Sequence, residues 1–314
     1  MSKSFKPYLF ALIFLLFNFS LSAQPLLTPT ELNTIQSDNQ SVKVVDIRPT
    51  QDYLAGHIVN AVNAPYELWR GPADNPGKLV DVQKLTELVR ALGIDQDTLV
   101  VVTSSGANPT DFGAAARVYW TLKYLGLEKL AILNGGVQAW LANGLELDKK
   151  QPNVVPSQFK AKLNQNILAT QEYVATHLDD EKTMLIDARP QDFYLGKTKA
   201  PTAKKPGTIK NAINVAHDTW FEPGTSLFVS TEEAKKIAQT QFTKLKEKTI
   251  SFCNTGHWAA TDWFALSEVL EQPNVKLYPA SLAEWSHASP ALAMDNVPSR
   301  GQQILKQLKS LVNK

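Results

Sequence analysis

Residues 44–49 read VVDIRP, and the same pattern returns in the second half of the chain as LIDARP at residues 185–190. The match continues outward to the end of each half, where GVQAW at 136–140 corresponds to SLAEW at 281–285. The repeating unit is about half of the 314-residue chain, which is longer than the 20 to 50 residues that are typical of solenoid proteins. The sequence therefore predicts two homologous domains.

Within the first half, short β-branched runs near residues 42–47, 99–102 and 131–133 alternate with helical patterns at 82–92 and 114–125. Buried parallel strands joined by crossover helices have this alternation. We therefore expect an α/β fold in both halves, each a mainly parallel sheet flanked by helices. Functional sites are expected at the carboxyl ends of the strands.

The repeat places the first domain at residues 27–150 and the second at 167–314. The segment between them, 151–166, contains prolines that interrupt regular structure and is predicted to be a linker. Residues 302–312 place apolar side chains on one helical face, which predicts a final helix that packs on a domain.

Residues 1–23 have the features of a signal peptide. Lys3 and Lys6 precede an apolar run at 8–21, which is too short to cross a bilayer, and small residues lead to a cleavage site after Ala23. We expect export, most simply to the periplasm, with no membrane attachment after cleavage. An uncleaved anchor is the alternative.

The 314 residues contain 32 Lys and Arg against 30 Asp and Glu. Two of those cations lie in the leader, so the remaining chain is neutral and a nucleic-acid partner is not predicted. Cys253 is the only cysteine, which excludes an internal disulfide and a cysteine-rich metal site.

Cys253 follows an apolar run at 249–252 and precedes a helical pattern over 259–270, which predicts a strand, a loop and a helix. Such a loop can direct several backbone N–H groups toward one point, where they stabilise a nucleophilic thiolate. An inert buried cysteine is the alternative. The predicted loop contains Asn254, Thr255, Gly256, His257, Trp258 and Ala259.

Three loop residues carry specific expectations. Gly256 permits backbone conformations that a side chain forbids. His257 either assists the thiolate and an anion or points to solvent, and Trp258 either forms a pocket wall or packs in the core. The other histidines fall in surface or repeat positions and have no predicted role: His57, His177, His217 and His287.

The duplicated Asp-x-Arg strands, the Cys-x-x-Gly loop and the Trp-containing endings resemble the tandem-domain rhodanese family of sulfurtransferases. The resemblance implies two rhodanese-like domains with a pocket between them, and it places the catalytic cysteine on Cys253. The matching position of the first domain is Ser104, which cannot hold a persulfide, so that domain is expected to be inactive. In this family Asp187 and Arg189 are chiefly structural and anchor nearby loops.

The resemblance also implies the chemistry. A small anionic sulfur donor such as thiosulfate gives its sulfur to Cys253, and the persulfide passes it to cyanide or a thiol, without a metal or organic cofactor. A 3-mercaptopyruvate sulfurtransferase and a non-catalytic persulfide carrier or binding module are the alternatives. Phosphatases that share this domain type need an arginine where this chain has Ala259, so a phosphatase is not favoured.

The sequence departs from the thiosulfate-cleaving members at two cationic positions. Phe193 stands where those members have an arginine, and Thr255 stands where their loop has a basic residue. Replacement charge is sought in the insertion before Gly207, and the candidate substrate contacts are Phe193, Lys197 and Lys199. A solvated loop is the alternative for this insertion.

Overall fold

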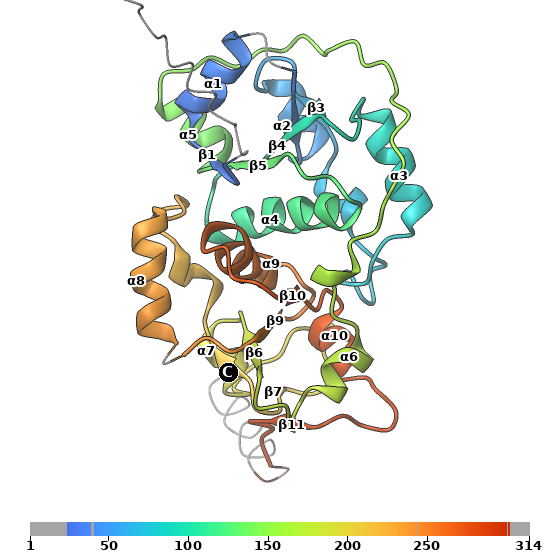
Figure 1. The fold of residues 1–314 in the computed structure, drawn as a ribbon, viewed down its shortest axis with the longest axis vertical. Coiled ribbons are helices and arrows are strands. Elements are labelled where there is room, and N and C mark those ends of the chain that lie inside the picture. Colours follow the sequence, from blue (N-terminus) through green and yellow to red (C-terminus); the bar gives the residue numbers. More distant parts are fainter. Residues whose placement is uncertain (1–23, 39–40, 243, 300, 302–314) are drawn as a thin grey trace, which may run out of the picture.

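Two mainly parallel β-sheets, one in each half of the chain, organise the computed structural model (Figure 1). The structure describes residues 24–38, 41–242, 244–299 and 301. The predicted leader at 1–23 and the predicted helix at 302–312 lie outside the described residues. The α/β fold expected from the repeat is confirmed in both halves.

The first sheet has five parallel strands in the order β1-β5-β4-β2-β3. The elements of this half are β1 (Leu26–Leu27), α1 (Pro29–Ser37), β2 (Val42–Asp46), α2 (Thr50–Ala55), β3 (Val62–Asn63), the 3₁₀ helix η1 (Tyr66–Trp69), α3 (Val82–Ala91), β4 (Leu99–Thr103), α4 (Pro109–Tyr124), β5 (Leu130–Leu133) and α5 (Gly136–Ala142).

The second sheet has four parallel strands in the order β10-β9-β6-β8, and β11 pairs with β7 in a small antiparallel ribbon. The elements of this half are the 3₁₀ helix η2 (Gln165–Ile167), α6 (Gln171–Thr176), β6 (Thr183–Asp187), α7 (Gln191–Tyr194), β7 (Thr208–Ile209), β8 (Ile213–Asn214), the 3₁₀ helix η3 (His217–Trp220), α8 (Thr231–Gln241), β9 (Lys248–Phe252), α9 (Trp258–Phe264), the π-helical turn η4 (Ala265–Val269), β10 (Val275–Leu277), α10 (Ser281–Trp285) and β11 (Met294–Asp295).

The helix α4 begins with a strong capping signal. Asn108 caps it by accepting a hydrogen bond from the backbone N–H of Asp111, and Pro109 occupies the first helical position. Twelve of its sixteen residues are buried, so α4 is an internal helix with no solvent-facing side.

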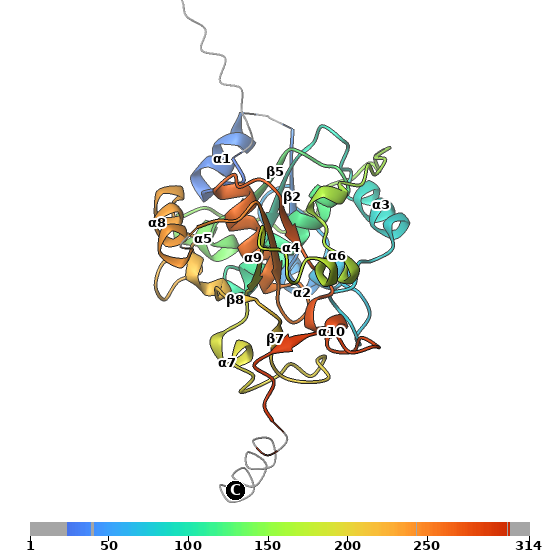
Figure 2. The same ribbon diagram turned by 60° about the horizontal axis from the view of Figure 1, so that its bottom comes forward.

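The two halves meet where α4 packs against α9. Both helices lie between the two sheets in Figure 1, and Figure 2 shows them at the centre of the molecule. Phe112 and Tyr119 of α4 contact the ring of Phe264, with ring centroids 5.6 and 5.2 Å apart. Because buried residues of both halves form one continuous cluster, the loops that precede α4 and α9 are held in fixed positions.

The chain between the two halves runs without helix or strand from Lys149 to Asn164. It is fastened to the first half, since Ser157 donates to the carbonyl of Ile94 and Phe159 is buried. Within the described residues, no helix is both long and apolar enough to cross a membrane.

Candidate functional site

Cys253 is the first residue after β9, one of the two central strands of the second sheet, and α9 begins five residues later at Trp258. This is the strand, loop and helix arrangement that the sequence predicts. The residue is 1% exposed. It therefore lies at the carboxyl end of a parallel strand, where open α/β sheets bind their ligands.

The backbone of Cys253 is fixed by Ser281. The Ser281 hydroxyl accepts the Cys253 N–H (3.0 Å) and donates to the carbonyl of Tyr278 (2.8 Å). Ser281 has a left-handed backbone (φ 54°), and the matching residue of the first domain, Gly136, has φ 58°. A serine in this conformation is strained, and backbone strain of this kind is found at functional sites. Here the strained residue holds the backbone of the cysteine.

Gly256 has the conformational role expected from the sequence. Its φ is 66°, in the left-handed region that favours glycine. A Cβ atom at this position would also collide with the carbonyl of Pro279 and the guanidinium of Arg117. Only glycine at position 256 therefore lets the loop approach Arg117 of the first domain this closely.

The loop leaves a row of backbone donors without acceptors. Within the part of the chain that the structure describes, no acceptor receives the N–H groups of the five residues Asn254, Thr255, Gly256, His257 and Trp258. Unpaired N–H groups in sequence at a helix N-terminus form an anion-binding loop. This loop is thus built to receive negative charge.

The corresponding loop of the first domain is already filled by a carboxylate of the chain. Asp111 Oδ2 accepts hydrogen bonds from the Ser105 hydroxyl (2.9 Å) and from the N–H groups of Gly106 and Ala107. The residue that matches Asp111 in the second domain is Ala260, which has no carboxylate. The second loop therefore keeps its N–H groups for an external anion.

The pair Asp187 and Arg189 anchors the loop, as the family resemblance implies. Arg189 donates to both carboxylate oxygens of Asp187 (2.8 and 2.6 Å), to the carbonyl of Gly207 and to Oδ1 of Asn254 (3.4 Å). Both side chains are almost fully buried.

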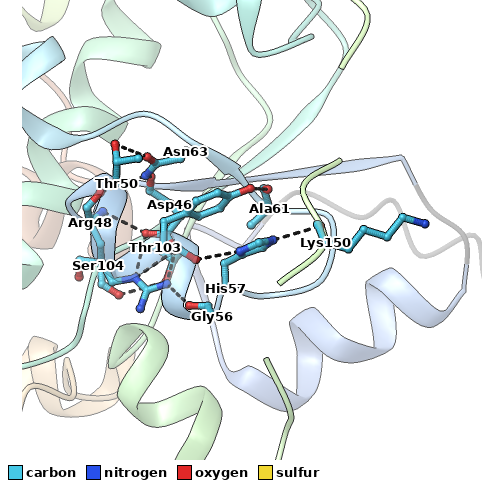
Figure 3. A network of polar contacts seen from close by, with 11 residues as sticks. Asp46, Arg48, Thr50, Gly56, His57, Ala61, Asn63, Thr103, Ser104 and Lys150 are labelled. Carbon is cyan, nitrogen blue, oxygen red and sulfur yellow. Dashed lines mark hydrogen bonds and ion pairs between the residues drawn. The ribbon is translucent and has the colours of Figure 1, made fainter. Parts of the chain in front are cut away.

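The first domain has the same pair in Asp46 and Arg48 (Figure 3). Arg48 donates to Asp46 and to the carbonyl of Gly56, which matches the contact between Arg189 and Gly207. The duplication therefore preserved the anchor in both domains, although it preserved the cysteine in only one.

Residues of the first domain complete the site, and the sequence analysis missed them. Arg70, which follows η1, donates to the carbonyl and the hydroxyl of Thr255 (3.0 Å each). Arg117 of α4 donates to the carbonyls of Gly256 (3.5 Å) and Gly77 (3.1 Å). Burial and the neighbouring Arg70 lower the pKa of Arg117 to about 9, so it remains charged at neutral pH.

His257 is directed at the first domain, which corrects the solvent-facing alternative. Its Nε2 lies 2.6 Å from the carbonyl of Thr110, so this nitrogen donates, and Nδ1 accepts from the Tyr66 hydroxyl (2.8 Å). Tyr66 in turn accepts from Arg70 (3.1 Å). Burial, assisted by the charge of Arg70, lowers the pKa of His257 to about 3. His257 is therefore a neutral link between the domains and supplies no positive charge.

Trp258 forms a wall together with His217, which is buried and had no predicted role. The two rings stack with centroids 4.8 Å apart, and the Trp258 indole donates to the Thr110 hydroxyl (3.1 Å). Burial lowers the pKa of His217. Ala259 is buried, and its carbonyl accepts a hydrogen bond from Ser251.

The three candidate substrate contacts lie in different surroundings. Phe193 contacts Trp258 edge-on (6.0 Å) and lies beneath the guanidinium of Arg189 (5.8 Å), so it borders the loop. Lys197 forms an ion pair with Asp192, and Lys199 donates to the carbonyl of Ala203. A contact between these lysines and a substrate stays a prediction.

We expect His257 to remain neutral in the folded protein at every pH above about 4. Its pKa is depressed relative to the ordinary value near 6.5, so the unfolded state binds more protons between about pH 6.5 and pH 3. The stability that the folded protein gains from a neutral His257 is therefore fully present above about pH 6.5 and is lost as pH falls from about 6.5 to about 3. NMR titration of the His257 ring measures the pKa directly.

Urea unfolding at about pH 7 and about pH 4.5 gives the matching energetic test. The loss of stability at the lower pH should be smaller in a His257→Gln variant than in the wild type. A His257 ring that titrates near pH 6.5 in the folded protein would contradict the assignment.

Only one of these first-domain residues had a signal in the sequence. Arg117 falls on the apolar helical pattern at 114–125, where a charged residue signals a buried contact. Tyr66 and Arg70 correspond to His217 and Phe221 in the second half, and neither stands in a pattern that marks a site. Among the described residues, no group of three or more metal-ligating side chains occurs.

The geometry defines a class of protein: a tandem α/β protein with one open anion-binding loop around a cysteine and one loop closed by its own carboxylate. Residues 28–143 and 170–288 both match the family described as the Rhodanese-like domain. The chain therefore belongs to the rhodanese family, as two domains in tandem.

Named relatives agree with this assignment. The chain is 30% identical over 247 residues to a thiosulfate sulfurtransferase of Bos taurus. The aligned region covers 76% of this chain and 80% of the relative. It is 31% identical over 246 residues to a putative thiosulfate sulfurtransferase of Saccharopolyspora erythraea, covering 75% and 84%.

Solved structures share the fold. The Tum1 protein of Saccharomyces cerevisiae has a TM-score of 0.73 at 19% identity, covering 87% of this chain and 98% of that one. An anaerobic ergothioneine biosynthesis enzyme of Chlorobium limicola has a TM-score of 0.76 at 20% identity, covering 88% and 71%.

Proposed function

We propose that Cys253 carries sulfur as a persulfide in a two-step transfer between a small anionic donor and a nucleophilic acceptor. The observation that carries this proposal is the contrast between the two loops. The first loop holds the carboxylate of Asp111, whereas the second has free N–H groups beside the only cysteine of the chain. The chain is a sulfurtransferase, in agreement with its named relatives.

In the first step the Cys253 thiolate attacks the outer sulfur of the donor. With thiosulfate, the S–S bond of the donor breaks, sulfite leaves with the bonding electron pair, and Cys253 retains the sulfur as a persulfide anion. The loop N–H groups stabilise that negative charge as an oxyanion hole stabilises an alkoxide. Cyanide then attacks the terminal sulfur, thiocyanate leaves, and the thiolate is restored.

Steady-state turnover separates this enzyme from the carrier alternative. We expect purified protein to release sulfite from excess thiosulfate in the presence of cyanide, over many turnovers, with ping-pong kinetics. Pyruvate release from 3-mercaptopyruvate, measured beside it, tests the second donor. Release that stops after one equivalent with both donors would favour a carrier over an enzyme.

Export is a separate proposal, supported by the charged and apolar pattern of residues 1–23. The mature protein would begin at Gln24 and act in the periplasm. N-terminal sequencing of the protein recovered from cells tests this, because retention of Met1 would contradict cleavage.

A further inference from the structure

Two guanidinium groups beside the cysteine loop have no carboxylate to neutralise them. Arg48 and Arg189 are each paired with an aspartate, but within the described ranges no carboxylate lies within 4.0 Å of Arg70 or Arg117. The acceptors that Arg70 and Arg117 contact are neutral carbonyls and hydroxyls. Their positive charge at the loop is therefore uncompensated.

The two arginines differ in what they can touch. Arg117 is 1% exposed, and its Nε is buried without a partner among the described residues. It can act on a ligand only through its charge. Arg70 is half-buried and reaches the loop from the first domain, so its guanidinium can meet a solute.

The position of Arg70 is set by a chain of hydrogen bonds. Arg70 Nη1 donates to the Tyr66 hydroxyl, which donates to His257 Nδ1, while Arg70 Nη2 donates to Thr255. These contacts leave Nε of Arg70 without an acceptor in the described part of the chain. Burial raises the pKa of Tyr66, so its hydroxyl remains a neutral donor to His257.

We infer that Arg70 recognises the oxyanion end of the sulfur donor, so that the first domain, and not the second, selects the substrate. The inference rests on the proposed function of Cys253. Two uncompensated cations and a row of free N–H groups favour a dianion over a monoanion. The substrate class is therefore a donor that ends in a sulfonate-type group, such as thiosulfate.

The same contact assists the chemical step. When the thiolate attacks the outer sulfur, the bonding pair of the S–S bond moves to the departing sulfite, whose oxygens become more negative. A guanidinium that holds these oxygens stabilises the leaving group more than the bound donor. The effect of Arg70 is thus confined to the first half-reaction, because the acceptor attacks a persulfide after sulfite has gone.

The second-domain residues that border the loop leave a need for a cation from the first domain. Phe193 borders the loop with an apolar ring and supplies no charge there. Arg189 is neutralised by Asp187. The first domain therefore supplies at the loop a free positive charge that neither of these two second-domain residues provides.

Loading of Cys253 from two donors tests the inference. We expect Arg70→Gln to lower kcat/KM for thiosulfate by about 10- to 100-fold, the effect of losing a charged hydrogen bond. Persulfide formation from the hydropersulfide of 2-mercaptoethanol, which has no sulfonate oxygens and at most one negative charge, should stay within about threefold of the wild type. Single-turnover cyanolysis of the preloaded enzyme should also be unchanged, and Arg70→Lys should recover part of the thiosulfate activity.

Lys129→Gln is the matched control, because Lys129 is an exposed cation paired with Asp97 in the first domain. An equal loss with thiosulfate and with the hydropersulfide in Arg70→Gln would mean that Arg70 only holds Thr255, and it would overturn the inference. An unchanged kcat/KM for thiosulfate would overturn it as well. If wild-type protein forms no persulfide from either donor, the proposed function fails first, and the inference fails with it.

Discussion

Replacement of Cys253 by serine is expected to abolish sulfur transfer, with activity reduced at least about a thousandfold. Serine has nearly the same volume, and its backbone N–H can still donate to Ser281, so the fold should lose only about 1 kcal/mol. The variant cannot form a persulfide because its hydroxyl oxygen does not accept sulfane sulfur. Sulfite release from thiosulfate and mass spectrometry of the intact protein measure the two effects.

The matched control is Ser104→Ala in the first domain. Ser104 occupies the position of the cysteine, but its loop binds Asp111, so turnover should change by less than about tenfold. Persistent transferase activity in Cys253→Ser would exclude the proposed mechanism. A large loss in Ser104→Ala would instead assign a chemical role to the first loop.

Asp187→Ala is expected to cost about 3–5 kcal/mol of unfolding free energy, the largest loss of stability among these variants. The substitution leaves the guanidinium of Arg189, which is 1% exposed, as an unpaired buried charge. It also removes the acceptor of the Thr208 hydroxyl. Because Arg189 also contacts Asn254, we expect the remaining folded protein to have a lower kcat. Urea denaturation and turnover per folded molecule measure the two effects.

Asp46→Ala is the corresponding change in the first domain. The Arg48 side chain is 10% exposed, so water can solvate the unpaired charge in part, and the loss of stability should be smaller. The Cys253 loop has no contact with this pair, so kcat should be retained. Equal losses of kcat in the two variants would show that the anchor of the second domain has no special connection to the site.

The sequence identified the fold and the central residue because both depend on local patterns. Strands β2, β4 and β5 and helices α3 and α4 appear where periodicity places them, and Cys253 lies at the predicted end of β9. Gly256 has the left-handed backbone that its position in the loop suggests. Each of these features is set by residues close together in the chain.

The electrostatics of the site were not predictable in this way. Local patterns in the sequence pointed to the insertion that contains Lys197 and Lys199, and to His257, as sources of positive charge. The structure places Arg70 and Arg117 at the loop and keeps His257 neutral, while a contact between the two lysines and a substrate stays a prediction. These contacts join residues more than a hundred positions apart, and no alignment of one half on the other reveals them.

Local sequence patterns were sufficient to predict two α/β domains of one origin, with a single thiol at the end of a strand in the second. The groups that surround that thiol depend on the packing of the two domains, because the contact of α4 with α9 brings Arg70, Tyr66 and Arg117 to the loop. The folded arrangement also closes the first loop with Asp111 and leaves the second loop open. Periodicity and turn chemistry act over a few residues, whereas charge and hydrogen bonding at a domain interface depend on distances that only folding sets.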